Sequence, residues 1–209
     1  TYKKTVGDEF DGCVPAIFTD EPQVTHKGTL AFAKSTADVT LPWTPELDTL
    51  YEKRYGAKIE DTLPELFWEK PNGEISRPRY LYHDFICQLF TEAFADNCGS
   101  WCQKNGISMT GHMMAEDSLQ SQTTCLGEAM RSYRNFQIPG IDMLCDGHNY
   151  ATAKQAQSAV HQYGREGMLS ELYGVTDWDY DFRGHKHQGD WQAALGVTVR
   201  VPHLAWMSM

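Results

Sequence analysis

The chain has 209 residues, of which 41% are hydrophobic and 22% charged, as in an ordinary globular protein with a sizeable core. Its formal net charge of −10 argues against nucleic acid or an anionic membrane as a partner, because both carry negative charge. No apolar run reaches the roughly 18 residues of a membrane-spanning helix. The first ten residues, TYKKTVGDEF, are too polar for a signal peptide.

The first half of the chain predicts one strand followed by helices. The strand is VPAIFT (14–19), and a polar loop follows it to about residue 41. Helices are expected over 42–56, which ends at a glycine suited to a C-cap, and over 62–70. A long amphipathic helix is predicted from residue 77 to Gly106, because its apolar residues recur every three or four positions.

The second half alternates strands with helices. The predicted strands are ISMTGH (107–112), PGIDML (139–144), GMLSELYG (167–174) and a last one that begins at residue 197. The predicted helices cover residues 119–136, 151–164 and 190–196. Alternation of this kind is typical of parallel strands joined by right-handed crossovers.

The fold class follows from this alternation and from the motifs that are missing. Neither GxGxxG nor GxxxxGK[ST] follows a strand, so a nucleotide-binding sheet is poorly supported. A (β/α)₈ TIM barrel fits better, although only about five of the eight strands are visible and a full barrel typically takes about 250 residues. We therefore predict an α/β fold in which residues 1–209 form a single, partial TIM-barrel catalytic domain, its C-terminal portion.

Each predicted strand carries an acidic residue or a histidine near its C-terminal end. These residues are Asp20 and Glu21, His112, Asp142, Glu171 and His203, with Glu116 and Asp117 shortly after His112. The C-terminal ends of barrel strands open on one face, so these side chains are expected around one pocket. Two carboxylic acids across a cleft are the arrangement used in glycoside hydrolysis: one protonates the leaving oxygen, and the other activates water or attacks the sugar.

The segments FTDEP, GHMMAE, PGIDML, SELYG and GVTVRVPHLAWMS, in this order, resemble the catalytic barrel of α-L-rhamnosidase-type glycoside hydrolases (family 106). The resemblance spans roughly residues 14–209. It implies a glycosidase that removes a terminal sugar from a polysaccharide or glycoside, with α-L-rhamnoside as the leading substrate. It also implies that the visible strands are the fourth to the eighth. The missing part of the barrel or accessory β-sandwich domains would be partners, and the location would be secreted or periplasmic.

The same resemblance implies roles for individual residues. Glu21 would be the general acid and Glu171 the general base or nucleophile, while a competing assignment makes Glu116 the acid. The residues expected to bind the sugar are His112, Asp20, His203, Tyr173 and Trp206. Family-106 enzymes use a calcium ion, for which Glu116 and Asp117 are candidate ligands here.

Two other functions remain open from the sequence. One is a non-catalytic or truncated carbohydrate-binding barrel, because an incomplete barrel leaves sheet edges exposed. The other is a metal-dependent hydrolase that uses His112, Glu116 and His148. Loss of activity in a chelator, together with bound zinc, would favour the second.

Overall fold

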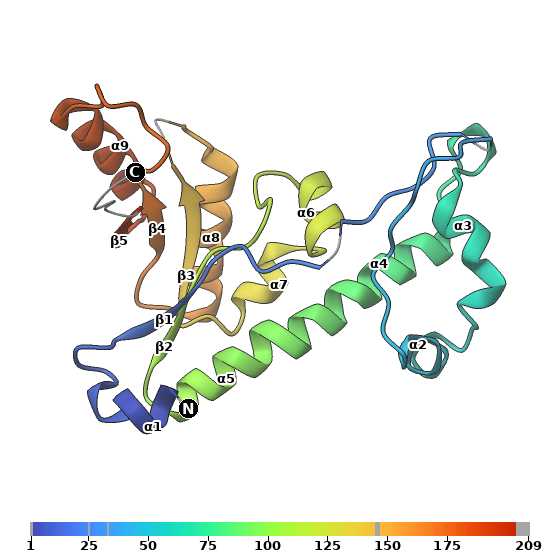
Figure 1. Ribbon diagram of the computed structural model, residues 1–209, viewed down its shortest axis with the longest axis horizontal. Coiled ribbons are helices and arrows are strands. Elements are labelled where there is room, and N and C mark those ends of the chain that lie inside the picture. Colours follow the sequence, from blue (N-terminus) through green and yellow to red (C-terminus); the bar gives the residue numbers. More distant parts are fainter. Residues whose placement is uncertain (1, 25, 33, 145–146, 204–209) are drawn as a thin grey trace.

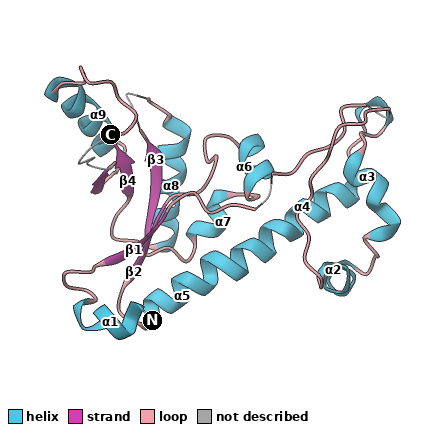
Figure 2. Ribbon diagram, viewed as in Figure 1, coloured by secondary structure: helices cyan, strands magenta, loops and turns pink. Residues whose placement is uncertain are grey.

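In the computed structural model, the described residues are 2–24, 26–32, 34–144 and 147–203. Within these residues, five parallel strands form one sheet in the order β1-β2-β3-β4-β5, which curves as a half-barrel (Figures 1 and 2). They are β1 (Ala16–Thr19), β2 (Ser108–Gly111), β3 (Ile138–Met143), β4 (Leu169–Leu172) and β5 (Val199–Pro202). The predicted α/β class and all five predicted strands are confirmed, and β1 and β5 form the two edges of the sheet.

Helices connect the strands and cover the outer face of the sheet (Figure 1). Those described are α1 (Tyr2–Val6), α2 (Leu47–Tyr55), α3 (Leu63–Phe67), α4 (Arg77–Phe90), α5 (Asn97–Lys104), α6 (Leu119–Cys125), α7 (Ala129–Tyr133), α8 (Tyr150–Tyr163) and α9 (Phe182–Ala194). The described part of the chain contains no helix long and apolar enough to cross a membrane.

The main core lies between the outer face of the sheet and helices α5, α7 and α8. Met109 of β2 and Ile141 of β3 are buried there, together with Tyr133 and Phe136. Helix α8 packs on β3 through three fully buried alanines, Ala153, Ala156 and Ala159. Burial of this apolar surface fixes the strands, and therefore fixes the positions of the residues that follow them.

A long helical rod leads from this core to a second apolar cluster. The rod consists of α4, a π-helical segment (Thr91–Asp96) and α5, and confirms the long helix predicted from residue 77 (Figure 1). The hydroxyl of Ser76 caps its start by accepting the backbone N–H of Arg79 at 3.1 Å. This same N-terminal part of the rod packs with α2 and α3 around the buried residues Leu47, Tyr51, Ile59, Leu66, Tyr82, Phe85 and Ile86.

Several predicted helices have different bounds in the structure. The helix expected over 42–56 begins only at Leu47, and the one expected over 62–70 ends at Phe67. The helix expected over 119–136 is divided into α6 and α7, because Gly127 has a φ of +107° and a Cβ there would lie 2.3 Å from the Cβ of Cys87. Helix α9 begins at Phe182 instead of residue 190. Its start was missed because Gly184 and Gly189 weaken the helical pattern, whereas the Asp181 carboxylate caps the helix by accepting the N–H of Gly184 at 2.9 Å.

Gly111, the last residue of β2, allows the ends of β1 and β2 to approach each other closely. Its φ is +120°, and a Cβ there would lie 2.0 Å from the carbonyl oxygen of Thr19 at the end of β1. Only glycine fits this position without displacing a strand. The close approach brings the residues after β1 beside the residue after β2.

Candidate active site

His112 directly follows β2, and its side chain is fully buried. Its backbone N–H donates to the carbonyl oxygen of Thr19 at 3.2 Å, which ties the end of β2 to the end of β1. The ring of Phe18 meets the imidazole edge-on, with 5.6 Å between the ring centroids. The strand pairing therefore holds this imidazole at the C-terminal end of the sheet.

Carboxylates from three other strands surround the imidazole. Its Nε2 lies 3.1 Å from Oδ1 of Asp20 and 4.0 Å from Oδ2 of Asp142, while its Nδ1 lies 3.7 Å from Oε2 of Glu171. The carboxylate of Glu21 also reaches this cluster, within 4.8 Å of ligand atoms of His112 and Asp142. The Asp20 side chain is 72% exposed and that of Glu171 only 13%, so the cluster runs from solvent into the protein.

The environment raises the pKa of both Glu21 and Glu171. For Glu21 the largest cause is burial, and the neighbouring Asp142 and Asp20 add to it while His112 offsets part of the rise. For Glu171 burial again dominates, His112 and His203 lower the pKa, and the two aspartates raise it. Carboxyl groups with raised pKa values are suited to proton transfer near neutral pH.

The backbone of Glu21 is held in an unusual conformation. Its φ is +45°, in the left-handed region that non-glycine residues rarely adopt, and Pro22 follows it. Such residues typically cost about 1–3 kcal/mol and concentrate at functional sites. The turn after β1 is thus strained at the residue whose carboxylate joins the His112 cluster.

Glu116 is buried in a polar network next to the His112 cluster, to which it is linked through the backbone of Asp142. Its carboxyl group accepts hydrogen bonds from the Asp142 N–H at 2.9 Å and from the Met113 N–H at 3.3 Å, and its Oε2 lies within hydrogen-bond distance, 2.6 Å, of the Tyr133 hydroxyl. Burial raises its pKa to about 8, and these hydrogen bonds offset part of the rise. Since Glu116 is bonded to the backbone of Asp142, it positions β3 relative to the loop after β2.

Several sequence-predicted ligands do not come together. The side chain of Asp117 is exposed and accepts a hydrogen bond from the Ser121 hydroxyl at 3.0 Å, whereas the Glu116 carboxylate is directed into the interior. His148 packs against Trp191, with 4.5 Å between ring centroids. Among the described residues, the groups able to share a metal ion are Asp20–His112–Glu171 and Glu21–His112–Asp142. Neither group includes Glu116, Asp117 or His148.

The remaining predicted sugar-binding residues occupy different surroundings. The imidazole of His203 lies near enough to Glu171 to lower the pKa of that carboxyl group, and the backbone N–H of His203 donates to the Leu172 carbonyl oxygen at 2.9 Å. The Tyr173 hydroxyl lies against Gly189 of α9, where an added Cβ would be 2.4 Å from it. Tyr173 therefore packs on a helix, while Trp206 lies outside the described residues.

Asp142 belongs to the cluster, as its place near a strand end predicted, but the sequence analysis gave it no catalytic, sugar-binding or metal-binding role. Its neighbours Ile141 and Met143 are buried in the core, so strand alternation directs Asp142 to the opposite face of β3. The register pairs Asp142 with Glu171 of β4, which brings the two carboxylates to one level of the sheet. Alternation along PGIDML was the signal that could have assigned its side chain to the site.

Comparison with solved structures agrees with this fold. The chain is similar to a rhamnosidase from Novosphingobium sp. PP1Y, with a TM-score of 0.61 and 19% sequence identity. The match covers 78% of this chain and 16% of the rhamnosidase chain, so this chain spans a small part of that enzyme's length. No family model and no curated protein matches the sequence. The two proteins therefore share a rhamnosidase-like fold.

Proposed function

We propose that the chain carries the acid–base residues of a glycoside hydrolase, with a terminal α-L-rhamnoside as the leading substrate. The observation that carries the proposal is the convergence of Glu21 and Glu171 on the buried His112, both with a raised pKa. The sugar specificity rests on the resemblance of the sequence motifs and on the rhamnosidase-like fold.

In this proposal the two glutamates have different tasks. Glu21 is the general acid that protonates the glycosidic oxygen, since its carboxyl group has a raised pKa. Glu171 is the general base or nucleophile, the role that the resemblance of the motifs implies, and the imidazoles of His112 and His203 offset part of the rise in its pKa. Asp20 and His203 contact sugar hydroxyls, whereas His112, which the resemblance also suggested for this role, has a fully buried side chain and instead positions the surrounding carboxylates. Glu116 is a positioning residue, because its buried carboxyl group is hydrogen-bonded to the Tyr133 hydroxyl and to the Asp142 N–H.

We further infer that the half-barrel is the C-terminal portion of a TIM barrel. Both outer strands, β1 and β5, have a free edge among the described residues. Phe18 of β1 is 38% exposed, and it lines an apolar pocket of about 330 Å³ with Ile17 and Trp101. Strands that pair with β1 and β5 would cover these surfaces. The missing part of the barrel is therefore the partner expected for this chain, with carbohydrate as the ligand.

Hydrolysis of an aryl α-L-rhamnoside tests the proposed activity. Glu21→Gln and Glu171→Gln are each expected to lower kcat by about 100-fold or more, because each removes a proton donor or acceptor. Glu60→Gln, at an exposed position outside the cluster, is the matched control and should retain activity. Binding of rhamnose, followed by NMR, gives a second readout that needs no turnover. Full activity in either glutamate variant would remove that residue from the catalytic pair.

A metal-assisted hydrolase is the second candidate, because His112 shares two possible ligand groups with carboxylates. Mixed imidazole and carboxylate donors suit zinc or manganese better than calcium, which prefers six to eight oxygen ligands. A chelator would abolish the activity of such an enzyme, and zinc or manganese would restore it. A two-carboxylate glycosidase without a metal would keep its activity in the chelator.

A further inference from the structure

Two glutamines of helix α9, Gln188 and Gln192, hold the end of β3. Both side chains are fully buried, and they lie one helical turn apart on the same face of α9. The Nε2 of each donates to the backbone carbonyl oxygen of Met143, at 3.4 Å from Gln188 and 3.2 Å from Gln192. The Nε2 of Gln188 also donates to the carbonyl oxygen of Gly147 at 3.0 Å. Met143 is the last residue of β3 and directly follows Asp142, so both amides hold the backbone next to a carboxylate of the cluster.

Packing alone does not explain why these two positions carry glutamine. Burial of an amide costs free energy unless its polar atoms find hydrogen-bond partners. The amide oxygens of Gln188 and Gln192 have no partner among the described residues, so each side chain is satisfied only through its NH₂ group. A leucine would fill a similar volume without this cost. The donors to the end of β3 are therefore the feature that distinguishes glutamine from an apolar residue here.

Asp142 is held on both sides along the backbone. Its own N–H donates to Oε1 of Glu116 at 2.9 Å, and the carbonyl oxygen of the next residue accepts from the two glutamines. The loop after β3 also packs on α9, where the ring of His148 meets that of Trp191 edge-on with 4.5 Å between centroids. Since a residue has only two soft backbone dihedrals, these contacts restrict the direction of the Asp142 side chain.

The same helix contacts the chain just after β4. A Cβ at the buried Gly189 would lie 2.4 Å from the hydroxyl oxygen of Tyr173, which comes two residues after Glu171. The Tyr173 ring also packs on that of His185, with 4.8 Å between centroids. Glycine is less favourable than alanine inside a helix, so the close approach of Tyr173 is what this glycine makes possible. Helix α9 therefore contacts the residues that follow both Asp142 and Glu171, which are paired in the sheet register.

We propose that Gln188, Gln192 and Gly189 are positioning residues for the carboxylate cluster. Through them α9 holds the ends of β3 and β4 together, so that the carboxylates of Asp142 and Glu171 stay at one level of the sheet. None of the three touches the reacting atoms. The effect expected on turnover rests on the proposed function, whereas the effect on the geometry of the cluster does not.

Side-chain ¹³C NMR titration of glutamate-labelled protein tests the proposal without an activity assay. The carboxylate of Asp142 raises the pKa of Glu171, so a displaced Asp142 should raise it less. Replacing both Gln188 and Gln192 with leucine is therefore expected to lower the pKa of Glu171 by at least about half of the lowering in Asp142→Asn. Adding Asp142→Asn to the leucine variant should bring the pKa only to its value in Asp142→Asn alone, because both changes act through one carboxylate.

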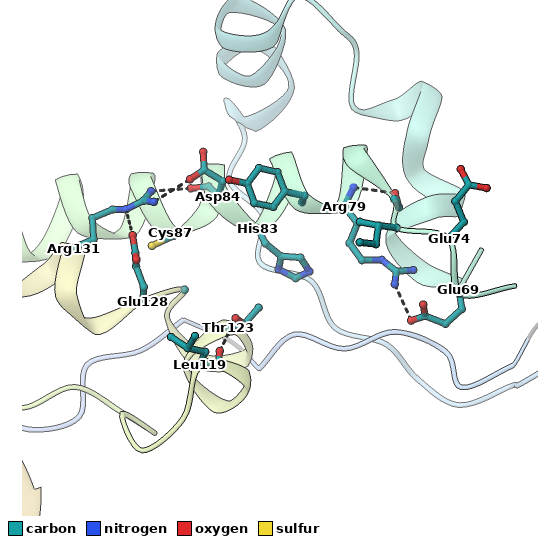
Figure 3. A pocket seen from close by; sticks show the side chains of 15 residues that line it. Glu69, Glu74, Arg79, His83, Asp84, Cys87, Leu119, Thr123, Glu128 and Arg131 are labelled. Carbon is teal, nitrogen blue, oxygen red and sulfur yellow. Dashed lines mark hydrogen bonds and ion pairs between the residues drawn. The ribbon is translucent and has the colours of Figure 1, made fainter. Parts of the chain in front are cut away.

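Two controls separate positioning from a general loss of stability. Gln103→Leu makes the same substitution at an exposed glutamine of α5 and should leave the pKa of Glu171 unchanged. Asp84→Asn weakens the ion pair with Arg131 (3.0 Å), in a pocket that no residue of the cluster lines (Figure 3). It should lower Tm and leave the pKa of Glu171 unchanged. An equal fall of this pKa in Asp84→Asn would show that the titration follows stability alone, against the proposal.

Single variants keep the test decisive if the double leucine variant does not fold. Gln188→Leu and Gln192→Leu each leave one side-chain donor at the end of β3, so each should lower the pKa of Glu171 by a smaller amount. Gly189→Ala should change the pKa of Glu171 more than that of Glu21, because only Glu171 lies on the strand that leads to the α9 contact.

Kinetics with the aryl rhamnoside give a second readout. The glutamine variants should lower kcat and leave KM nearly unchanged, since they displace a carboxylate without removing a substrate contact. Absence of activity in the unsubstituted chain would contradict the proposed function alone, and the NMR titration would still decide the positioning role. An unchanged pKa of Glu171 in the folded glutamine variants, or a further fall when Asp142→Asn is added, would overturn the proposal.

Discussion

The hydroxyl of Tyr133 lies 2.6 Å from Oε2 of Glu116 and 2.8 Å from the carbonyl oxygen of Gly140. A hydroxyl has one proton, so it cannot donate to both acceptors at once. With its pKa raised to about 8, Glu116 is protonated at neutral pH and can donate to Tyr133, which then donates to Gly140. Each polar group in this buried series of hydrogen bonds then has a partner. The series joins the loop after β2, through Glu116, to Gly140 of β3.

The pKa of Glu116 predicts how stability depends on pH. Its folded-state pKa of about 8 lies above the ordinary value of 4.5, so its contribution is fully present below about pH 4.5 and is lost as pH rises through 8. Glu116→Gln keeps the hydrogen-bonding groups without the charge. We expect it to remove this loss, which is on the order of a few kcal/mol at pH 8 and above. Urea unfolding at pH 5 and pH 8.5 measures the effect, and an unchanged pH dependence in the variant would contradict it.

Replacing His112 should raise the pKa of both Glu21 and Glu171. The imidazole lowers both values in the native cluster, so His112→Gln leaves the two carboxylates without that electrostatic support. Each carboxylate then deprotonates at a higher pH than in the unsubstituted chain. Side-chain ¹³C NMR titration of glutamate-labelled protein measures this directly, without an activity assay. A downward shift of either group would show that the charge relationship is misassigned.

Replacing Asp142 should have the opposite effect. Its carboxylate raises the pKa of Glu21 and of Glu171, so Asp142→Asn is expected to lower both values. The substitution keeps the backbone N–H that bonds to Glu116. Asp61→Asn removes an exposed charge outside the cluster and serves as the control in the same NMR titration. Equal titration curves for Asp142→Asn and the control would exclude a direct interaction.

Gly111→Ala should destabilise the fold strongly. The added Cβ would lie 2.0 Å from the Thr19 carbonyl oxygen, at a φ of +120° that alanine rarely adopts. We expect a loss of about 3 kcal/mol or more in the free energy of unfolding, because β1 and β2 must separate. Gly28→Ala is the matched control, since no atom lies within 4 Å of its added Cβ. Denaturant unfolding of both variants tests the prediction, which fails if the two behave alike.

Local sequence patterns were sufficient for most elements of the fold. The five strands and the long helix from residue 77 were predicted, since apolar periodicity and turn residues act over a few neighbouring positions. The division at Gly127 and the early start of α9 were missed. The first depends on the approach of Cys87, which is far away in sequence, and the second on a cap within a glycine-containing segment.

The sequence by itself determined which strands carry acids and histidines at their C-terminal ends, because that depends only on local order along the chain. Only the tertiary structure decided which of these side chains meet. Strand register brought Asp142 to the cluster beside Glu171. Packing of the loop after β2 buried Glu116 against the Tyr133 hydroxyl. They also left Asp117 at the surface and placed His148 against Trp191. A side chain's partners depend on packing between segments distant in the sequence, which no local pattern contains.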